Sequence, residues 1–321
     1  MTAGPPLVRL EHADEAHAAV TVVDWCLGNT CNQACSYCPD VLHDGSSGFP
    51  ELATALAFCE RVITHQQALG RRVFFHLTGG EPTLYRGLPE MLSFVKARGA
   101  GAGLVSNGKV ALRWWEKVAP LLDAIVLTYH VEFADLDHFI QVARLLSGSL
   151  KTHINVAMLP LRFDECHHHA RRIALECEGA TMTLKPLLKD FRDELYPYTD
   201  EQRRVIREGC QPQQPRFGER GVRGSMRCFD RDGESRTRAA ADLVMAGDNR
   251  FAGWTCNAGI ESIAVNHRGE VYRAMCQEGG LLGRIVDVKL PLPTQPIVCR
   301  KRRCSCLSDI MLTKWDAREP G

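Results

Sequence analysis

Three cysteines lie close together near the start of the chain, in the run Cys31-Asn-Gln-Ala-Cys35-Ser-Tyr-Cys38. Thiolates at this spacing can bind three irons of a 4Fe–4S cluster and leave the fourth iron without a protein ligand. An iron with an open position can bind a small chelating molecule, which turns an electron-transfer centre into a catalytic one. The spacing therefore predicts a catalytic 4Fe–4S cluster on Cys31, Cys35 and Cys38.

Two short motifs further along the chain could bind a small ligand beside such a cluster. In Gly79-Gly80-Glu81, the glycines let the backbone approach a ligand closely and offer exposed N–H groups to a charged one. The second motif is Ser106-Asn107 followed by a glycine, which on its own is more typical of a simple turn.

Taken together, these motifs resemble those of the radical S-adenosylmethionine (radical SAM) superfamily. The resemblance implies that the amino and carboxylate groups of SAM ligate the open iron, and that a flavodoxin-like or ferredoxin-like protein donates the reducing electron. It also implies that reductive cleavage of SAM gives a 5′-deoxyadenosyl radical that removes a hydrogen atom from an unactivated carbon. The residues implied to bind SAM are Tyr37, Gly79, Gly80, Glu81, Ser106 and Asn107.

Three polar residues follow later strands of the same region. His130 and Glu132 come just after a predicted strand, and His130 could orient SAM or touch the substrate. The alternative for His130 is that it only caps the strand end. We take His130 and Glu132 as candidate catalytic residues and Lys185, after the sixth predicted strand, as a weaker one.

A second group of cysteines lies near the C-terminus. Two short strands, Ser262–Asn266 and Val271–Arg273, predict a β-hairpin with a cysteine on each side. This layout resembles the twitch domain, the shortened relative of the SPASM domain, which holds an auxiliary 4Fe–4S cluster. Five cysteines compete for four ligand positions, so that Cys304 or Cys306 is spare or leaves a site open. The five are Cys256, Cys276, Cys299, Cys304 and Cys306.

The C-terminal group departs from the SPASM pattern in two ways. The interval from Gly269 to Cys276 is longer than usual, and the seven-cysteine array for two auxiliary clusters is absent. One auxiliary cluster is therefore expected. The alternative is a structural zinc site on Cys256, Cys276, Cys304 and Cys306, which would stabilise the hairpin but could not transfer electrons.

Six of the 14 cysteines are scattered, and we expect them to be small buried hydrophobic residues or inert thiols. They are Cys26, Cys59, Cys166, Cys177, Cys210 and Cys228. A secreted disulfide scaffold would be short and carry a leader, and this chain shows neither feature. The clustered cysteines instead indicate metal ligation in a reducing cytoplasm.

Short apolar strands alternate with amphipathic helices from about residue 18 to 208, and this predicts βαβ units with a parallel sheet. The expected strands are Val20–Trp25, Val73–Leu77, Ala102–Ser106, Ala124–Tyr129, His153–Ala157 and Thr181–Leu184. The expected helices are Glu51–Leu69, Leu88–Arg98, Leu112–Leu121, Leu136–Leu146, Phe163–Cys177 and Asp200–Glu208. Six units match the open (β/α)6 partial barrel that the resemblance implies, and the cluster loop then falls at the C-terminal ends of the strands.

The chain divides into four predicted parts: an N-terminal extension (1–17), the partial barrel (18–208), an arginine- and glycine-rich linker or lid (209–250), and the twitch/SPASM-like domain (251–321). The arginines of the third part could clamp an anionic substrate. The alternative is a solvated linker whose arginines are offset by nearby acidic residues.

The bulk composition fits a soluble cytoplasmic enzyme. The 321 residues are 45% hydrophobic and 24% charged, with a formal net charge of +1. Such a balance gives no general attraction to nucleic acid or membrane. The sequence begins without a secretory signal, and no apolar run approaches the roughly 18 residues that span a bilayer.

An auxiliary cluster could accept the second electron when the substrate radical is oxidised, so a net two-electron oxidation is expected. The favoured substrate is a small natural-product intermediate, such as an aminocyclitol or sugar, dehydrogenated at a carbinol. The alternative is maturation of a ribosomal precursor peptide by a crosslink, thioether or other side-chain change. About 20 residues precede the first strand, too few for an added peptide-binding domain. A non-enzymatic iron–sulfur or zinc scaffold, or a redox sensor, would leave Gly79-Gly80-Glu81 unexplained.

Overall fold

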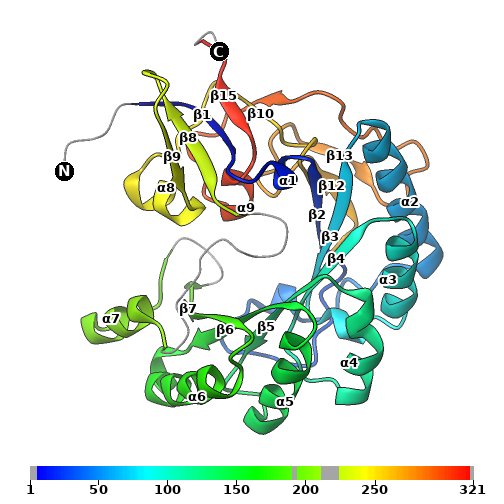
Figure 1. Cartoon of the computed structure of the whole chain (residues 1–321). Helices are drawn as coiled ribbons and strands as arrows, with labels where there is room; N and C mark the ends of the chain where they lie inside the picture. Colours follow the sequence, from blue (N-terminus) through cyan, green and yellow to red (C-terminus); the bar gives the residue numbers. More distant parts are fainter. Residues whose placement is uncertain (1–5, 190–193, 211–223, 319–321) are drawn as a thin grey trace.

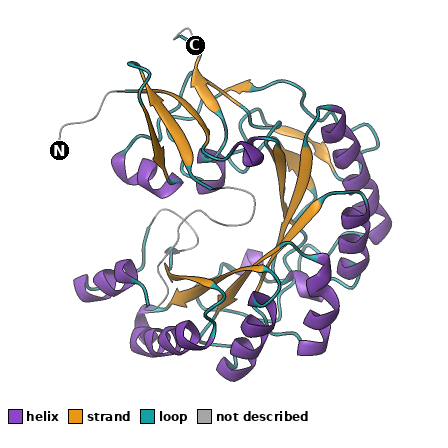
Figure 2. Ribbon diagram, viewed as in Figure 1, coloured by secondary structure: helices purple, strands orange, loops and turns teal. Residues whose placement is uncertain are grey.

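A strongly curved sheet of nine strands runs through the molecule, and helices cover its outer face (Figures 1 and 2). The computed structural model describes residues 6–189, 194–210 and 224–318. The strand order of this sheet is β13-β12-β11-β2-β3-β4-β5-β6-β7. All neighbours from β11 to β7 pair in parallel.

The predicted (β/α)6 partial barrel is confirmed in this sheet. Its strands are β2 (Val20–Cys26), β3 (Arg72–Thr78), β4 (Gly101–Ser106), β5 (Ala124–Tyr129), β6 (Lys151–Met158) and β7 (Thr181–Pro186). Its helices are α2 (Leu52–Ala68), α3 (Leu88–Ala97), α4 (Leu112–Val118), α5 (Leu136–Ser147), α6 (Phe163–Glu176) and α7 (Asp200–Glu208). Each of the twelve expected elements is present, with ends that differ by at most three residues.

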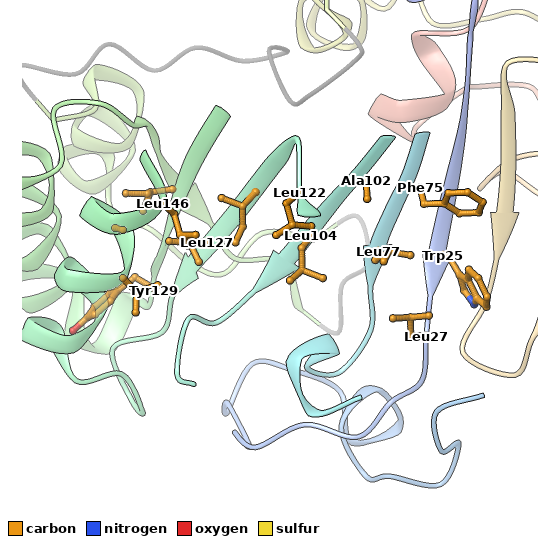
Figure 3. Packing of buried hydrophobic residues seen from close by; sticks show 14 of the residues in the cluster. Trp25, Leu27, Phe75, Leu77, Ala102, Leu104, Leu122, Leu127, Tyr129 and Leu146 are labelled. Carbon is orange, nitrogen blue, oxygen red and sulfur yellow. The ribbon is translucent and has the colours of Figure 1, made fainter. Parts of the chain in front are cut away.

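The core of the barrel lies between the sheet and the helices. Alternate strand residues point outward and pack there, among them Trp25, Phe75, Leu77, Leu104 and Leu127, all at most 1% exposed (Figure 3). Full burial of one such side chain contributes about 1.5–3 kcal/mol relative to leaving it in water. Because successive strand residues face opposite sides, the intervening positions line the inner face of the barrel.

The predicted C-terminal hairpin is present as β11 (Ser262–Val265) and β12 (Glu270–Tyr272), followed by β13 (Leu281–Arg284). Gly269 closes the turn with a φ of +73°, a conformation that favours glycine. The hairpin does not stand apart from the barrel, because β11 pairs in parallel with β2. The C-terminal part therefore extends the barrel sheet beyond its first strand.

A second sheet of six strands has the order β14-β10-β15-β1-β8-β9. Its strands are β1 (Leu7–His12), β8 (Met226–Asp230), β9 (Ser235–Arg238), β10 (Trp254–Cys256), β14 (Ile297–Val298) and β15 (Lys314–Asp316). The short helices α1 (Glu15–Ala18), α8 (Ala240–Ala246) and α9 (Leu307–Ile310) accompany it. Figure 1 shows this sheet opposite the inner face of the barrel, with both described ends of the chain in it.

This sheet corrects two of the predicted boundaries. The N-terminal extension contributes β1 to the sheet, and the predicted linker or lid is wrong for residues 226–246, which form β8, β9 and α8. Met226 and Cys228 are buried on alternate positions of β8, a period of two that the surrounding arginines obscure in the sequence. Arg216, Arg220 and Arg223, the remaining candidates for an anion clamp, lie outside the described residues.

A buried hydrogen bond between a histidine and a carboxylate joins the two sheets. Nε2 of His12, on β1, lies 3.1 Å from Oε2 of Glu261, the residue before β11. Burial alone would raise the pKa of Glu261. The hydrogen bond and charge of His12, with N–H donors from Asn257 and Thr313, instead hold the pKa at about 2. This carboxylate therefore fastens the N-terminal strand to the barrel.

Other predictions concern single side chains. Five of the six scattered cysteines are buried, as expected, and Cys26 is partly buried. None of the helices in the described part of the chain is long and apolar enough to cross a membrane.

Candidate functional site

The cluster loop follows β2 at the C-terminal edge of the barrel. Cys35 is buried, and Cys31 and Cys38 are half-buried. Burial is the main reason that the pKa of Cys35 is raised to about 12 and that of Cys38 to about 11, and the charges of neighbouring thiolates add to both. Adjacent thiols with raised pKa values are stable as thiolates only with a compensating cation. The loop therefore fits an iron cluster.

Two residues after β5 hold this loop in place. The backbone N–H of Ser36 donates to Oε2 of Glu132 at 2.9 Å. The hydroxyl of Tyr37 hydrogen-bonds with Nδ1 of His130, and the two rings stack with centroids 6.0 Å apart. Burial, with the charge of Lys185, lowers the pKa of His130 to about 4, so its ring is neutral at pH 7. The candidate catalytic residues His130 and Glu132 thus contact the cluster loop itself.

Glu81 is a buried hub at the ends of β3 and β4. Its side chain is 1% exposed and accepts four hydrogen bonds. Oε1 accepts from the N–H and hydroxyl of Thr83 and from the hydroxyl of Ser106, and Oε2 accepts from the N–H of Asn107 at 2.8 Å. Burial raises the pKa of Glu81 against the effect of these donors. Oε2 retains a lone pair for a further donor.

The glycines before Glu81 allow a close backbone contact with the start of the cluster loop. The N–H of Gly80 donates to the carbonyl of Gly28, so it is not exposed to a ligand. A Cβ on Gly80 would lie 2.3 Å from the carbonyl oxygen of Thr30, and one on Gly79 would lie 2.7 Å from that of Gly28. The glycines let the motif pair closely with the start of the cluster loop.

Asn107 completes the link between these segments. Its Nδ2 donates to Oδ1 of Asn32, inside the cluster loop, at 2.7 Å. Ser106 and Asn107 are both buried. The structure thus gathers all six residues expected to bind SAM at one edge of the barrel, next to Cys31, Cys35 and Cys38.

Four C-terminal cysteines line one small cavity beside the second sheet, namely Cys256, Cys276, Cys299 and Cys304. Cys306, the fifth candidate, begins helix α9 and is not among the residues that line the cavity. Within the described ranges, no three His, Cys, Asp or Glu side chains converge closely enough to hold a single metal ion. A 4Fe–4S cluster would spread these cysteines over separate irons, whereas zinc would need four ligands that converge on one ion, with Zn–S bonds of about 2.3 Å.

A lysine and an aspartate that the sequence analysis did not single out support this cavity. Lys314 is 2% exposed, and its Nζ donates to the carbonyls of Asp309 and Ile310 at 2.7 and 2.9 Å. Its charge opposes the effect of burial on the pKa of Cys256. The carboxylate of Asp309 accepts from the N–H of Cys276 at 2.6 Å. A buried cation beside four thiols favours an anionic group such as a thiolate-bound cluster.

A polar pair on the inner face of the barrel was also missed. Asp24 on β2 and His76 on β3 are direct neighbours in register, and Nδ1 of His76 lies 2.8 Å from Oδ1 of Asp24. His76 lines a cavity of about 410 Å³ that extends along the inner face toward the N-terminal ends of the strands, where Lys151 and Thr181 begin β6 and β7. The signal in the sequence for this pair was that Asp24 and His76 each interrupt an apolar strand.

Known proteins resemble this chain in sequence and fold. The radical SAM superfamily model matches residues 25–184. A protein of Thermoplasmatales archaeon (strain ISO4-H5), described as an S-adenosylmethionine-dependent nucleotide dehydratase, is 32% identical over 118 residues, which is 36% of this chain. The matched part spans 39% of that relative's length.

Two solved structures share the fold over most of the chain. SuiB of Streptococcus suis bound to S-adenosylmethionine has a TM-score of 0.52 at 13% identity, covering 86% of this chain and 64% of that one. Native anSMEcpe with bound AdoMet has a TM-score of 0.50 at 14% identity, covering 84% and 79%. Identities this low show a common fold alone.

Proposed function

Because the chain belongs to the radical SAM superfamily, we propose that it oxidises a small natural-product intermediate by two electrons, with the help of one auxiliary 4Fe–4S cluster. The family implies a catalytic 4Fe–4S cluster and SAM. Bound together, they supply a 5′-deoxyadenosyl radical that takes a hydrogen atom from the substrate.

Each part of the first site has a role in this proposal. Cys31, Cys35 and Cys38 hold the cluster, and Glu132 and His130 fix the loop that carries them. Oε2 of Glu81 has a lone pair for the amino group of SAM. Tyr37, Gly79, Gly80, Ser106 and Asn107 complete the SAM site as the family resemblance implies.

The observation that carries the oxidative reaction is the second cysteine cavity. Four thiols around one cavity, with the buried Lys314 beside them, suit an auxiliary cluster that can take one electron. We assign the ligands as Cys256, Cys276, Cys299 and Cys304. Cys306 is then the spare fifth cysteine.

The inner cavity supports a small substrate over a peptide. Its volume of about 410 Å³ lies within the range of about 300–1,000 Å³ that is typical of small-molecule sites. The likeness to SuiB, which has been solved with a precursor peptide, concerns the fold and leaves peptide maturation as the weaker alternative.

A nucleotide is the second candidate substrate. The archaeal relative is named as a nucleotide dehydratase, and its match to this chain is the strongest in sequence identity among those described above. A nucleotide also carries carbinol carbons in its ribose, so both candidates present the same kind of C–H bond to the radical.

An acidic electron carrier of the flavodoxin or ferredoxin type is the expected partner. Residues 300–303 read Arg-Lys-Arg-Arg, are all exposed, and connect two of the four cavity cysteines. Charge complementarity of this kind speeds the encounter of electron-transfer partners. We place the docking face on this loop.

The first test is the iron and sulfide content after anaerobic reconstitution. We expect about eight irons per chain in the wild type and about four in a Cys31→Ala/Cys35→Ala/Cys38→Ala variant, because two 4Fe–4S clusters become one. A Cys256→Ala/Cys276→Ala variant should also hold about four. Four irons in the wild type and none in the triple variant would refute the auxiliary cluster.

The second test is the formation of 5′-deoxyadenosine with three panels: aminocyclitols and sugars, nucleotides, and short peptides. The proposal expects stoichiometric 5′-deoxyadenosine and a ketone or aldehyde with a member of the first panel. Turnover confined to nucleotides or to peptides would replace the proposed substrate by that class.

A further inference from the structure

Asp24 and His76 form a dyad whose geometry leaves one ring nitrogen for a ligand. Nδ1 of His76 faces Oδ1 of Asp24 at 2.8 Å, so with Nδ1 protonated the other nitrogen, Nε2, is an acceptor. The His76 side chain is 33% exposed and lines the inner cavity, while Asp24 lies behind it and is 8% exposed. A carboxylate behind a histidine that faces a cavity is the arrangement of a general base.

The inner face around the dyad carries unsatisfied polar atoms. Oδ2 of Asp24, Oγ of Ser262 and Oγ1 of Thr183 are all buried without a hydrogen-bond partner in the described part of the chain. Buried polar atoms in native proteins are nearly always paired, so the unpaired Oδ2 of Asp24 marks the dyad as an unusual polar pair. Ser262 and Thr183 are not among the residues that line the cavity.

The dyad lies on the two strands that connect the first cysteine site with the C-terminal hairpin. His76 is three residues before Gly79, and at about 3.3 Å per residue it sits roughly 10 Å below the edge where the SAM residues gather. On its other side, Asp24 is in register with Ala264 of β11, the hairpin strand between Cys256 and Cys276. A substrate bound at His76 would thus lie below the edge where the SAM residues gather, close to the strand that pairs β2 with the C-terminal hairpin.

We propose that His76, oriented by Asp24, is the base that removes the hydroxyl proton of a small polyhydroxylated alcohol bound inside the barrel. This inference rests on the proposed oxidation and names the group that completes it. The dyad pairs two strands of the sheet, but a purely structural pair needs neither a histidine nitrogen facing a cavity nor an unpartnered carboxylate oxygen.

The reaction balances with this base. Loss of the carbinol hydrogen atom leaves a carbon-centred radical that still carries its O–H group. Nε2 of His76 takes the hydroxyl proton, and the C–O bond becomes a C=O bond as one electron leaves for a one-electron acceptor, the iron–sulfur group expected on the C-terminal cysteines. The products are a ketone, a protonated His76 stabilised by Asp24, and an acceptor reduced by one electron.

The test of this step uses holoenzyme that carries His76→Gln. Its substrate is the alcohol of the aminocyclitol and sugar panel that the wild type oxidises. This alcohol is deuterated at its carbinol carbon. We expect deuterium to reach 5′-deoxyadenosine at a rate within a few-fold of the wild type, while ketone formation falls about 100-fold or more. A substrate radical should persist in the electron paramagnetic resonance spectrum. Ketone formation within twofold of the wild type, or loss of hydrogen abstraction together with the ketone, would overturn the proposal.

Two further measurements keep the test independent of activity and of folding. In ¹⁵N-histidine-labelled holoenzyme with oxidised clusters, His76 should show the tautomer protonated at Nδ1, and Asp24→Asn should shift it toward a mixture. A His76 protonated at Nε2 in the wild type would contradict the assignment. His168→Gln, an exposed histidine on α6, is the matched control and should leave ketone formation unchanged.

The two proposals can fail separately. If the wild type forms no ketone from any alcohol of the panel, the oxidation itself is wrong. If the wild type forms a ketone and His76→Gln does so equally well, only the role of the dyad is wrong.

Discussion

Glu81 shows how one buried carboxylate can organise a cofactor site. Its four accepted hydrogen bonds come from three residues on two strand ends, so the position of Asn107 depends on it directly. Through Asn107, the same carboxylate influences Asn32 in the cluster loop. The charge that could attract the amino group of SAM therefore also holds the surrounding backbone.

Replacing Glu81 by Gln should disrupt this hub. The NH₂ group of glutamine cannot accept a hydrogen bond. It would face either the N–H of Asn107 or the three donors that bind Oε1 in the wild type, and those donors would lose their acceptor. We expect a loss of about 1–3 kcal/mol in the free energy of unfolding, together with weaker SAM binding by equilibrium dialysis. Glu178→Gln, at an exposed position, is the control. Unchanged SAM affinity in Glu81→Gln would show that SAM does not use this carboxylate.

Single residues also show what could and could not be predicted from the sequence. The cysteine triad and Glu81 could be predicted because their spacing is local. Asp24 and His76 are 52 residues apart in the chain, and only the register of β2 and β3 brings them together. Lys314 gave no local signal, since its burial depends on Phe251 and on helix α9.

At the scale of elements, the pairing between the cluster loop and the glycine motif determines the shape of the first site. The N–H groups of Gly80 and Glu81 donate to the carbonyls of Gly28 and Thr30 at 2.9 and 2.8 Å, so the two segments run side by side as an extension of β2 and β3. A side chain at position 80 has no room to fit between them.

Gly80→Ala should therefore displace the start of the cluster loop. The added methyl group would lie 2.3 Å from a backbone oxygen, which cannot move aside as a side chain could. Overpacking of this kind costs about 1–3 kcal/mol, and we expect the first cluster to be lost, leaving about four irons per chain. Gly48→Ala, where a Cβ meets nothing within 4 Å, should keep about eight. Full iron content in both variants would contradict this account.

The barrel elements were predictable because each strand and helix has its own periodic pattern of apolar residues. The second sheet was not, because β1, β8 and β15 find partners more than 200 residues away and are short or rich in arginine. The pattern of Met226 and Cys228 is too brief to separate a strand from a linker.

At the scale of the whole molecule, the hydrogen bond between His12 and Glu261 connects the two sheets. The pKa of Glu261 is about 2 in the folded protein against an ordinary value of 4.5. A lowered pKa means that the folded state favours the ionised carboxylate. Its contribution to stability is complete above about pH 4.5 and is lost as the pH falls toward 2.

Glu261→Gln should consequently be destabilised at pH 7 by an amount on the order of 3 kcal/mol, from a pKa change of about 2.5 at 1.36 kcal/mol per unit. The difference from the wild type should shrink as the pH is lowered from about 5 to 3. Chemical denaturation at a series of pH values measures this. A difference that stays constant over this range would exclude Glu261 as the titrating group.

The proposed docking of an electron carrier on the exposed basic loop, residues 300–303, gives a further prediction. Arg300→Glu/Arg302→Glu should slow electron transfer with an acidic flavodoxin at low salt by about 10-fold, and the difference should shrink at high salt because ions screen the attraction. Stopped-flow absorbance follows the reaction. Arg113→Glu/Lys117→Glu, an equal change of charge on α4, should have little effect. Equal slowing in both variants would point to net charge and not to this face.

The pairing of β11 with β2 has a consequence for how the protein is made. Thr21, near the start of β2, donates a hydrogen bond to the carbonyl of Ile260, 239 residues later. A ribosome adds about 5–20 residues per second, so one edge of β2 waits roughly 10–50 s for its partner. An uncovered strand edge is a template for pairing with other chains. The newborn barrel therefore exposes an unpaired edge of β2 until the C-terminal hairpin emerges, and covering this edge would limit pairing with other chains.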